Sequence, residues 1–324
     1  MSAHDLGAAA GAPPTNHTGG ERLPSGLSID WLQEHYRESG YVADRPLAAA
    51  LFLALRLERP LLLEGEAGVG KTEVAKVLAR VLGTRLIRLQ CYEGLDVSTA
   101  VYEWNYPRQM LEIRLMEARG EAREAEAADI FTERFLIRRP LLQAIDAGDG
   151  PPPVLLIDEV DRADEEFEAY LLELLAEYQV TVPELGSLRA EHPPRIILTS
   201  NRTREVHDAL KRRCLYHWID YPGFDKELAI VRARIPGVDE ELAARVVAVV
   251  QRLRRLDLVK APGVAETLEW VTALLALGAR ELSPEVLEET FGVIVKYEED
   301  LRRLRSLVGE LLRTPSGADE PASS

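Results

Sequence analysis

Cysteine is scarce in this chain of 324 residues, which has two, Cys91 and Cys214, far apart in the sequence. Disulfide frameworks and structural zinc sites need several cysteines at short, regular spacings, and neither pattern is present. Both thiols are expected to be reduced and buried, because a free cysteine packs as a small apolar side chain. The sequence therefore does not indicate a protein stabilised by cross-links or by a structural metal.

Long apolar runs are also lacking. The longest one covers residues 47–55, whereas a helix needs about 20 predominantly apolar residues to cross a bilayer. The N-terminus has no basic region followed by an apolar core, which is the pattern of a secretory signal. We therefore expect a cytoplasmic protein without an integral membrane segment.

Basic residues are outnumbered, with 39 Lys and Arg against 54 Asp and Glu. Proteins that bind nucleic acid broadly do so by neutralising phosphates with Lys and Arg. The chain also has no basic patch interleaved with aromatic residues, the pattern typical of single-strand binding. We therefore expect no nucleic-acid partner, and the charge balance leaves open only a local basic groove.

One stretch, by contrast, has a chemistry that can be recognised: a turn that fits the pattern G-x-x-x-x-G-K-S/T. Its residues are Gly65, Glu66, Ala67, Gly68, Val69, Gly70, Lys71 and Thr72. An apolar run at 61–63 predicts a strand before this P-loop, and the periodicity of 73–82 predicts a helix after it. Glycines let backbone N–H groups surround phosphate oxygens, and the helix dipole favours an anion there. We expect Lys71 to reach the β- and γ-phosphates of ATP, and the Thr72 hydroxyl to bind Mg²⁺.

Two acidic residues, Asp158 and Glu159, follow an apolar run at 154–157. Parallel α/β sheets bind their ligands at the carboxyl ends of the strands. Asp158 is suited to hold Mg²⁺ through water, and Glu159 is suited to act as the base that orients the attacking water. The alternative is that the two acids cap the helix predicted at 165–177. The P-loop upstream favours the nucleotide-binding role.

Polar residues also end later elements of the same region. Asn201 ends a buried strand at 195–201, where it is expected to contact the γ-phosphate or the attacking water; the alternative is an ordinary turn asparagine. Arg212 and Arg213 end a short helix at 206–213. They are either catalytic arginines or two solvated residues at a helix C-terminus, where the dipole favours positive charge.

Composition divides the chain into a sequence of parts. Residues 1–26 are rich in Ala, Gly, Pro, Ser and Thr and are predicted to be a disordered lead, as is the polar tail at 314–324. Alternating strand and helix patterns over 27–223 predict an α/β nucleotide-binding domain with a parallel sheet. Residues 224–313 predict a small all-helical lid domain. Its helices are expected at residues 226–234, 240–256, 264–277, 284–289 and 293–312.

The segment from about 95 to 150 is too long for an ordinary connection between two strands. We interpret it as an insertion with its own hairpin or helices, including an acidic helix at about 116–129. Trp104 and Tyr106 are its candidates for exposed contact residues. One hypothesis is that the insertion contacts a client or partner protein. The alternative is a hairpin that packs on the sheet.

From about residue 44 to residue 312, these features resemble the AAA+ ring ATPases, and more narrowly the MoxR group. The general AAA+ signals are the P-loop, the strand that ends in Asp158 and Glu159, then Asn201 and the arginine pair, in this order. The stretch 158–182 is similar to the one that follows the second nucleotide motif in the MoxR group. The insertion resembles the MoxR insert. This resemblance implies a P-loop NTPase fold, a helical lid, and hydrolysis of ATP with Mg²⁺.

Within the MoxR group the chain is similar to the CoxD-type subfamily. The similar stretches are QCYEG at 90–94, YEWNY at 102–106, FLIRRPL at 135–141 and LKRRC at 210–214. The resemblance implies an ATP-driven chaperone whose client is carbon monoxide dehydrogenase or a related molybdenum hydroxylase. It implies a partner protein with a von Willebrand factor A domain, and a homo-oligomeric ring, expected to be a hexamer. Arg213, with Arg212 as the close alternative, is then expected to act on the nucleotide of a neighbouring subunit.

The chain departs from the AAA+ pattern in its lid. Many AAA+ proteins carry an arginine at the start of a lid helix, but the corresponding stretch 262–270 has none. Either Lys260 replaces it or the lid is coupled to the nucleotide differently, and the contact is left unassigned. Two other functions are compatible with the fold: a nucleic-acid motor or clamp loader, and a nucleotide-gated scaffold with little turnover. Glu159 disfavours the scaffold, because a switch that does not hydrolyse ATP needs no base.

Overall fold

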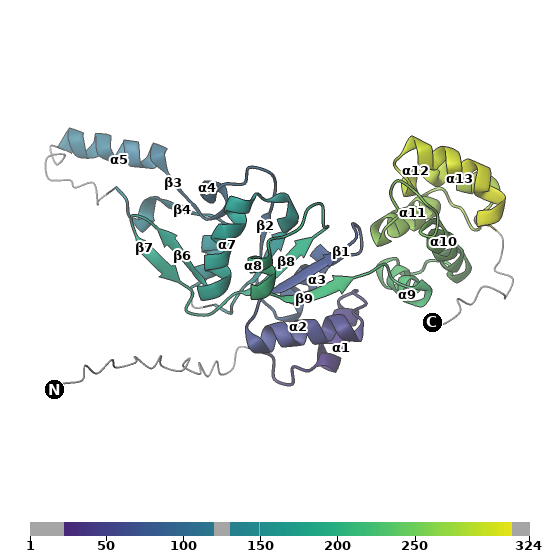
Figure 1. The fold of residues 1–324 in the computed structure, drawn as a ribbon, viewed down its shortest axis with the longest axis horizontal. Helices are drawn as coiled ribbons and strands as arrows, with labels where there is room; N and C mark the ends of the chain where they lie inside the picture. The colour runs from purple at the N-terminus through teal and green to yellow at the C-terminus, as the bar shows by residue number, and fades with distance from the viewer. Residues whose placement is uncertain (1–22, 120–129, 149, 313–324) are drawn as a thin grey trace, which may run out of the picture.

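The computed structural model describes residues 23–119, 130–148 and 150–312. Its centre is a five-stranded sheet in the order β2-β5-β8-β1-β9, in which all neighbours are parallel (Figure 1). The strands are β1 (Leu61–Gly65), β2 (Leu86–Gln90), β5 (Val154–Asp158), β8 (Arg195–Ser200) and β9 (Leu215–Ile219). The predicted α/β fold with a parallel sheet and a C-terminal helical region is confirmed.

The three central strands are buried along their whole length, which explains their continuous apolar runs. Their register aligns Leu62 with Leu198 and Leu155 with Ile196. Because the strands are parallel and in step, the segments that follow them emerge at one edge of the sheet. The P-loop, the acidic pair and Asn201 are therefore brought to the same edge.

Helices cover both faces of the sheet. Alternate side chains of β1 point to opposite sides: Leu61 and Leu63 belong to one core and Leu62 to the other. The first core is completed by α1 (Ile29–Glu38), α2 (Arg45–Leu57) and α3 (Lys71–Val81). The second is completed by α6 (Pro140–Ile145), α7 (Glu165–Glu177) and α8 (Asp208–Arg213).

Side-chain caps begin the first two helices. The Ser28 hydroxyl accepts a hydrogen bond from the Trp31 N–H (3.1 Å) at the start of α1, and the Asp44 carboxylate accepts one from the Leu47 N–H (3.0 Å) at the start of α2. These bonds satisfy N–H groups that have no partner inside the helix. These bonds fix where α1 and α2 begin. The start of α2 also sets where the connection 39–44 ends, beside the P-loop helix.

The insertion is a mixture of short elements. They are α4 (Val97–Ala100), β3 (Tyr102–Trp104), α5 (Tyr106–Arg119), the 3₁₀ turn η2 (Glu133–Phe135), β4 (Leu136–Arg138) and α6. Strands β3 and β4 pair in antiparallel fashion, so the hairpin that we considered does form. In Figure 1, α5 extends away from the sheet at the far end of the domain from the helical region.

Two expectations for the insertion were wrong. The helix begins at Tyr106 and not near residue 116, because Asn105 caps it: the Asn105 side chain accepts from the Arg108 N–H (3.1 Å). The rest of the predicted helix, 120–129, lies outside the described residues. Trp104 is 5% exposed and packs edge-to-face against Phe131 (ring centroids 5.2 Å), so it is a core residue and not a contact residue. Tyr106 is 59% exposed.

A second hairpin, β6 (Gln179–Val182) with β7 (Gly186–Arg189), follows α7. Between β9 and residue 312 the chain is helical (Figure 1). This region has a separate apolar core that includes Trp270 and Phe291. Its helices are α9 (Phe224–Arg234), α10 (Glu240–Leu253), α11 (Val264–Ala276), α12 (Pro284–Ile294) and α13 (Glu298–Leu311). The predicted boundary between the last two was wrong, because α12 continues to Ile294 and ends where Val295 turns extended.

None of the helices in the described part of the chain is long and apolar enough to cross a membrane.

Candidate functional site

The P-loop wraps between the end of β1 and the start of α3. Gly65 needs to be glycine because a Cβ there would lie 2.1 Å from the Ile219 carbonyl oxygen on β9. Gly70 has φ +93°, in the left-handed region that favours glycine, and forms the N-cap of α3. These two positions let the backbone turn tightly and direct the N-terminus of α3 into the loop, which is the geometry that binds phosphate groups.

Lys71 is buried beneath this loop. Its Nζ donates to the carbonyl oxygens of Gly65 (2.8 Å) and Glu66 (2.6 Å). An ammonium group has three N–H donors, so one remains for an anion. Burial lowers the pKa of Lys71 to about 8, although nearby acids such as Asp161 oppose that shift. An anion bound in the loop would stabilise the charged form.

Asp158, at the end of β5, is 2% exposed and uses both carboxylate oxygens. Its Oδ1 accepts from the Thr72 hydroxyl (2.9 Å) and from the Thr199 hydroxyl (2.5 Å), and its Oδ2 accepts from Arg88 (2.6 Å). Thr72 and Asp158 thus place two oxygens side by side at the mouth of the P-loop. Mg²⁺ prefers oxygen ligands and is usually held by one or two protein groups with phosphates and water. This donor set fits Mg²⁺.

Glu159 stands beside Asp158 with its carboxylate held from two strands. Oε1 accepts from Asn201 Nδ2 (3.3 Å) at the end of β8, and Oε2 accepts from Gln90 Nε2 (3.0 Å) at the end of β2 and from Arg162 (3.1 Å). Its backbone has φ +55°, uncommon for a residue other than glycine, and its N–H donates to the Thr199 hydroxyl (2.9 Å). Strain of this kind concentrates at functional sites.

The alternative for the acidic pair was to cap helix α7, but a different residue caps that helix. Asp164 caps α7, accepting from the Phe167 N–H (2.9 Å). Asp158 and Glu159 belong instead to the site at the sheet edge.

Three further residues, Asp161, Gln90 and Arg88, belong to the site although no role was predicted for them from the sequence. Asp161 is buried and accepts from the N–H groups of Asn201 (3.2 Å) and Thr203 (2.8 Å), which ties the loop after β8 to the loop after β5. Gln90 and Arg88 lie on β2 and reach the acidic pair on β5. Gln90 could have been predicted, because it is a polar residue at the carboxyl end of a strand, where parallel sheets place their ligands.

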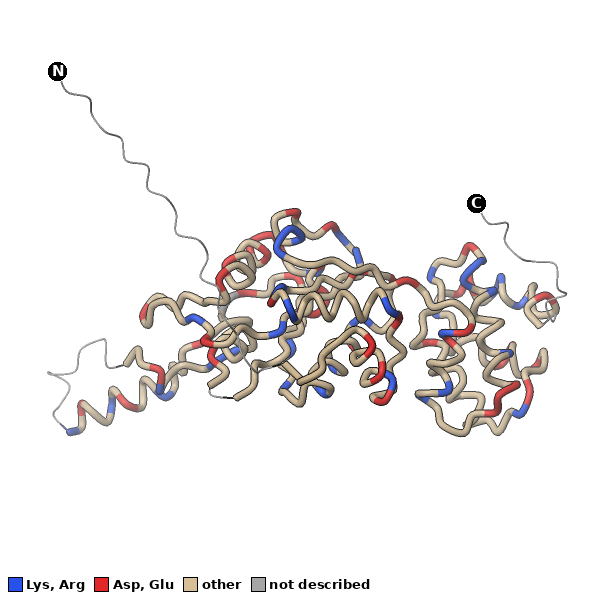
Figure 2. Tube along the Cα trace, turned by 90° about the horizontal axis from the view of Figure 1, so that it is seen from below, with Lys and Arg blue, Asp and Glu red and all other residues tan. Residues whose placement is uncertain are grey.

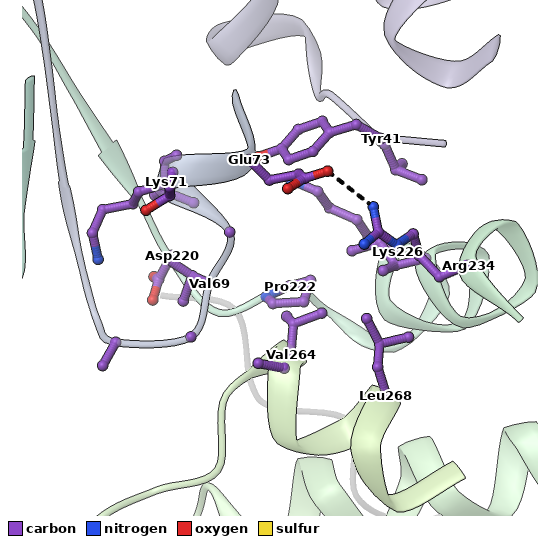
Figure 3. A pocket seen from close by; sticks show the side chains of 18 of the residues that line it. Tyr41, Val69, Lys71, Glu73, Asp220, Pro222, Lys226, Arg234, Val264 and Leu268 are labelled. Atoms are coloured by element: carbon purple, nitrogen blue, oxygen red, sulfur yellow. Dashed lines mark hydrogen bonds and ion pairs between the residues drawn. The ribbon is translucent and has the colours of Figure 1, made fainter. Parts of the chain in front are cut away.

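A cavity of about 370 Å³ extends from the P-loop toward the helical region (Figure 3). It also contains Glu159 and Asn201. The other walls come from the connection after α1, the segment after β9, α9 and α11; they are Gly40, Tyr41, Val42, Ile219, Asp220, Pro222, Lys226, Ile230, Arg234, Val264, Ala265 and Leu268. In Figure 3, Lys71 lies on one side of the cavity, whereas Tyr41, Arg234 and Leu268 lie on the other. A phosphate-binding end joined to a largely apolar end suits a nucleotide, and the volume lies within the range of ligand pockets.

Helix α11 meets the P-loop through its backbone. The N–H groups of Val264 and Ala265 both donate to the Gly68 carbonyl oxygen (3.0 and 3.2 Å). A Cβ at Gly263 would lie 2.8 Å from the Ala67 carbonyl oxygen, so the approach is close. Lys260, the candidate for the missing arginine, is exposed and does not line the cavity. The contact that a lid arginine makes in many AAA+ proteins stays unassigned in this chain.

Two ion pairs join α9 to the nucleotide-binding domain at the rim of the cavity. Arg234 pairs with Glu73 of α3 (3.1 Å), and Lys226 pairs with the α2 cap Asp44 (2.6 Å). Burial by itself raises the pKa of Asp44, but the hydrogen bonds from Lys226 and from the Leu47 N–H outweigh it and lower the pKa. Asp44 is therefore held as a carboxylate.

Arg212 and Arg213 lie away from the P-loop and from this cavity. Both are exposed at the end of α8, and neither lines the cavity. The Arg212 carbonyl oxygen accepts from Arg59 (3.0 Å). Their predicted role concerns a neighbouring subunit and stays a prediction.

Comparisons with known proteins agree with the geometry of the sheet edge. Residues 60–214 match the family model described as AAA domain, dynein-related subfamily. The chain is 28% identical over 269 residues to the gas vesicle ATPase GvpN2 of Halobacterium salinarum, covering 80% of this chain and 75% of that protein. It is 23% identical over 271 residues to an uncharacterized protein of Staphylococcus epidermidis, covering 82% and 92%.

Among solved structures, the Thermotoga maritima RuvB Holliday junction branch migration motor is similar at 15% identity with a TM-score of 0.43, over 88% of this chain and 78% of that one. The matched family segment runs from the residue before β1 to the residue after α8. It therefore contains the P-loop, the acidic pair and Asn201.

Proposed function

From the match of residues 60–214 to the AAA domain model of the dynein-related subfamily and from the geometry of the site, we propose that the chain is an AAA+ ATPase. It hydrolyses ATP with Mg²⁺ and uses the energy to remodel a client protein. One observation carries the hydrolysis: Glu159 is held by Asn201 and Gln90 beside the Thr72–Asp158 pair, at the mouth of the P-loop. A base, an oxygen pair for the metal and a buried lysine thus converge on one cavity.

The roles follow from the chemistry of each group. Lys71 neutralises charge on the phosphates, and the P-loop N–H groups bind their oxygens. Thr72 and Asp158 hold Mg²⁺, which offsets the charge of the phosphate oxygens when bound. Glu159 orients the attacking water and accepts its proton, while Asn201 and Gln90 fix the direction of the Glu159 carboxylate.

The experiment compares Glu159→Gln with Lys71→Ala. Glu159→Gln is expected to bind a fluorescent ATP analogue like the wild type but to release phosphate on the order of 10² times more slowly, because it keeps the shape and loses the base. Lys71→Ala is expected to bind the analogue about 10- to 100-fold more weakly, since it loses a charge-assisted contact. Glu165→Gln, an exposed substitution in the first turn of α7, is the matched control. Normal phosphate release by Glu159→Gln would remove Glu159 from catalysis.

For the client, we propose a protein of the molybdenum hydroxylase class, such as carbon monoxide dehydrogenase, matured with a partner that carries a von Willebrand factor A domain. The resemblance of four stretches of the chain to the CoxD-type subfamily supports this. The relative from Halobacterium salinarum is named a gas vesicle ATPase, so a client of a different kind is the competing proposal. Co-purification of the chain with each candidate client, with ATP and with the Glu159→Gln variant, separates the two.

A nucleic-acid motor is the second candidate function for this fold. In the view of Figure 2, basic and acidic residues alternate along both parts of the molecule, and the chain has a net charge of −15. Neither observation favours binding along a phosphate backbone. Filter binding with single- and double-stranded DNA at low salt is expected to show no retention, and retention would favour the motor.

A further inference from the structure

Arg88 lies in the middle of the edge strand β2 and reaches across to Asp158 on β5. The register pairs Arg88 with Leu156 and Gln90 with Asp158, so the arginine side chain extends forward along the strand. Its Nε and Nη2 donate to the same oxygen, Oδ2 of Asp158 (3.0 and 2.6 Å). The arginine side chain is 48% exposed and the aspartate is 2% exposed. A half-exposed cation is thus attached to a buried carboxylate of the nucleotide site.

This contact fixes the plane of the Asp158 carboxylate. One oxygen accepts from the hydroxyls of Thr72 and Thr199, and the other accepts from the guanidinium. Because a guanidinium only donates and holds its donors in a rigid plane, it keeps the carboxylate from rotating out of this plane. One oxygen of Asp158 is thus held beside Thr72.

The same guanidinium also orients Gln90. Arg88 Nη2 donates to Gln90 Oε1 (2.5 Å), and the Gln90 Nε2 donates to Glu159 Oε2 (3.0 Å). An amide can turn over and exchange its oxygen and nitrogen, and the oxygen would repel a carboxylate. Arg88 prevents the exchange, because it has no acceptor to offer the amide nitrogen. One side chain therefore fixes the direction of both acidic residues.

We propose that Arg88 is a positioning residue for hydrolysis, which it controls through Asp158 and through the relay Gln90–Glu159. The proposal rests on the proposed function, in which these acids hold Mg²⁺ and orient water. It assigns two separable effects to Arg88: its charge weakens the attraction of Asp158 for Mg²⁺, and its geometry supports turnover.

Replacing Arg88 by methionine separates these effects. The Arg88→Met variant loses the charge beside Asp158, so the Mg²⁺ concentration for half-maximal binding of a fluorescent ATP analogue is expected to fall about 3- to 10-fold. Its kcat for phosphate release is expected to fall on the order of 10- to 100-fold, because Gln90 is no longer oriented toward Glu159 and the carboxylate loses one of its contacts. Arg88→Lys keeps the charge, but its single nitrogen cannot hold Asp158 and Gln90 in the same geometry. This variant is expected to have the Mg²⁺ midpoint of the wild type and the low kcat of Arg88→Met.

Arg85→Met is the matched control, since Arg85 is an exposed arginine that precedes the same strand and donates to the Gln143 carbonyl oxygen (2.9 Å). Binding of the analogue in EDTA is expected to stay within twofold of the wild type for every variant. A Mg²⁺ midpoint and a kcat of Arg88→Met within twofold of the control would overturn the proposal. So would a parallel loss of binding in EDTA, which marks a merely structural role.

A double variant tests the relay. If Arg88 acts on Glu159 through Gln90, the kcat of Arg88→Met combined with Gln90→Leu is expected to equal that of Gln90→Leu alone. If the loss of kcat in the double variant equals the product of the losses in the two single variants, the relay is contradicted. If the wild type releases no phosphate, the proposed function fails, but the Mg²⁺ midpoint still tests the contact between Arg88 and Asp158.

Discussion

At the scale of single residues, Lys71 shows how the fold sets the chemistry of the site. Its amine is buried among backbone carbonyls, and burial lowers its pKa to about 8. Near neutral pH the amine is still charged, but it is close enough to its pKa that a small rise in pH removes the charge. Few lysines titrate so near physiological pH, since the ordinary value is about 10.4.

A pH dependence of nucleotide affinity follows. Bound phosphates favour the ammonium form and raise the pKa of Lys71, so binding above pH 8 takes up a proton. The affinity for a Mg²⁺–ATP analogue is therefore expected to be constant below about pH 7 and to fall as the pH rises through 8, by up to about tenfold per pH unit. Titrations at pH 7, 8 and 9 measure this.

The Lys71→Arg variant is the control for that titration, because an arginine stays charged at all of these pH values. Its affinity, whatever its absolute value, is expected to be flat from pH 7 to pH 9. A wild-type affinity that is equally flat would mean that Lys71 keeps an ordinary pKa in the folded protein.

At the scale of elements, helix α11 contacts the P-loop through its backbone, in the lid stretch that has no arginine. The contact is made by the N–H groups of Val264 and Ala265, and it depends on the absence of a side chain at Gly263. The backbone of Gly263 has φ −84°, which any residue adopts, so glycine is needed for space and not for conformation. The lid is thus seated on the loop that binds the phosphates.

Gly263→Ala is expected to lift α11 from the P-loop, because the added Cβ would lie 2.8 Å from the Ala67 carbonyl oxygen. Since α11 also lines the cavity, the affinity for the ATP analogue is expected to fall about tenfold, the effect of losing one or two backbone hydrogen bonds. Gly292→Ala, within α12 and with open space around its Cβ, is the matched control and is expected to leave affinity unchanged. Unchanged affinity in Gly263→Ala would show that the seating of α11 does not matter for binding.

The insertion separates a core residue from an exposed one within three positions. Trp104→Ala is expected to lower the free energy of unfolding by about 3–5 kcal/mol, the usual cost of removing a buried aromatic side chain. Tyr106→Ala is expected to change it by less than about 0.5 kcal/mol, since Tyr106 is 59% exposed. Urea denaturation of the two variants checks this, and equal losses would contradict the packing of the hairpin. Contact of the insertion with a client then remains a proposal for Tyr106 and α5.

These elements also show what a sequence can predict. The boundaries of α7 match the prediction at both ends, because Asp164 caps the helix and its apolar residues repeat at helical spacing. The P-loop and the acidic pair were found because each lies within a short local pattern. The helix α5 was misplaced because its cap, Asn105, has no distinctive neighbours.

The rest of the cavity has no local pattern at all. Tyr41, Lys226 and Leu268 line it from three segments that only tertiary packing brings together. Arg88 and Gln90 were missed for a related reason, since a polar side chain on an edge strand is ordinarily solvated. Their contacts with Asp158 and Glu159 depend on the pairing of β2 with β5.

At the scale of the whole molecule, the position of the arginine pair has a consequence for assembly. Arg212 and Arg213 lie at the C-terminal end of α8, exposed, and do not line the cavity of their own chain. Charge develops on the γ-phosphoryl oxygens during hydrolysis. Apart from Lys71, the cations that line the cavity are paired with acidic residues of the same chain; they are Lys76, Lys226 and Arg234. We therefore propose that the active unit is a ring, expected to be a hexamer, in which Arg213 of one subunit completes the site of the next.

Subunit mixing tests this arrangement. Arg213→Ala alone and Lys71→Ala alone are both expected to be nearly inactive, since an arginine that acts from a neighbour contributes on the order of 10³-fold to the rate. In a mixture, some interfaces pair an intact P-loop from the Arg213→Ala subunit with an intact arginine from the Lys71→Ala subunit. Phosphate release is therefore expected to return in part.

Lys71→Ala mixed with Glu159→Gln is the matched control, because both residues act within their own subunit and no interface regains a complete site. That mixture is expected to stay inactive. The same experiment with Arg212→Ala decides between the two arginines, since only the one that acts across the interface is rescued by mixing. If the Arg213→Ala mixture stays inactive while sedimentation shows that both proteins assemble, or if Arg213→Ala hydrolyses ATP normally, Arg213 does not act on the neighbouring subunit. Rescue would instead tie hydrolysis to assembly, because a single chain, with Arg212 and Arg213 outside its own cavity, would hold only part of the catalytic site.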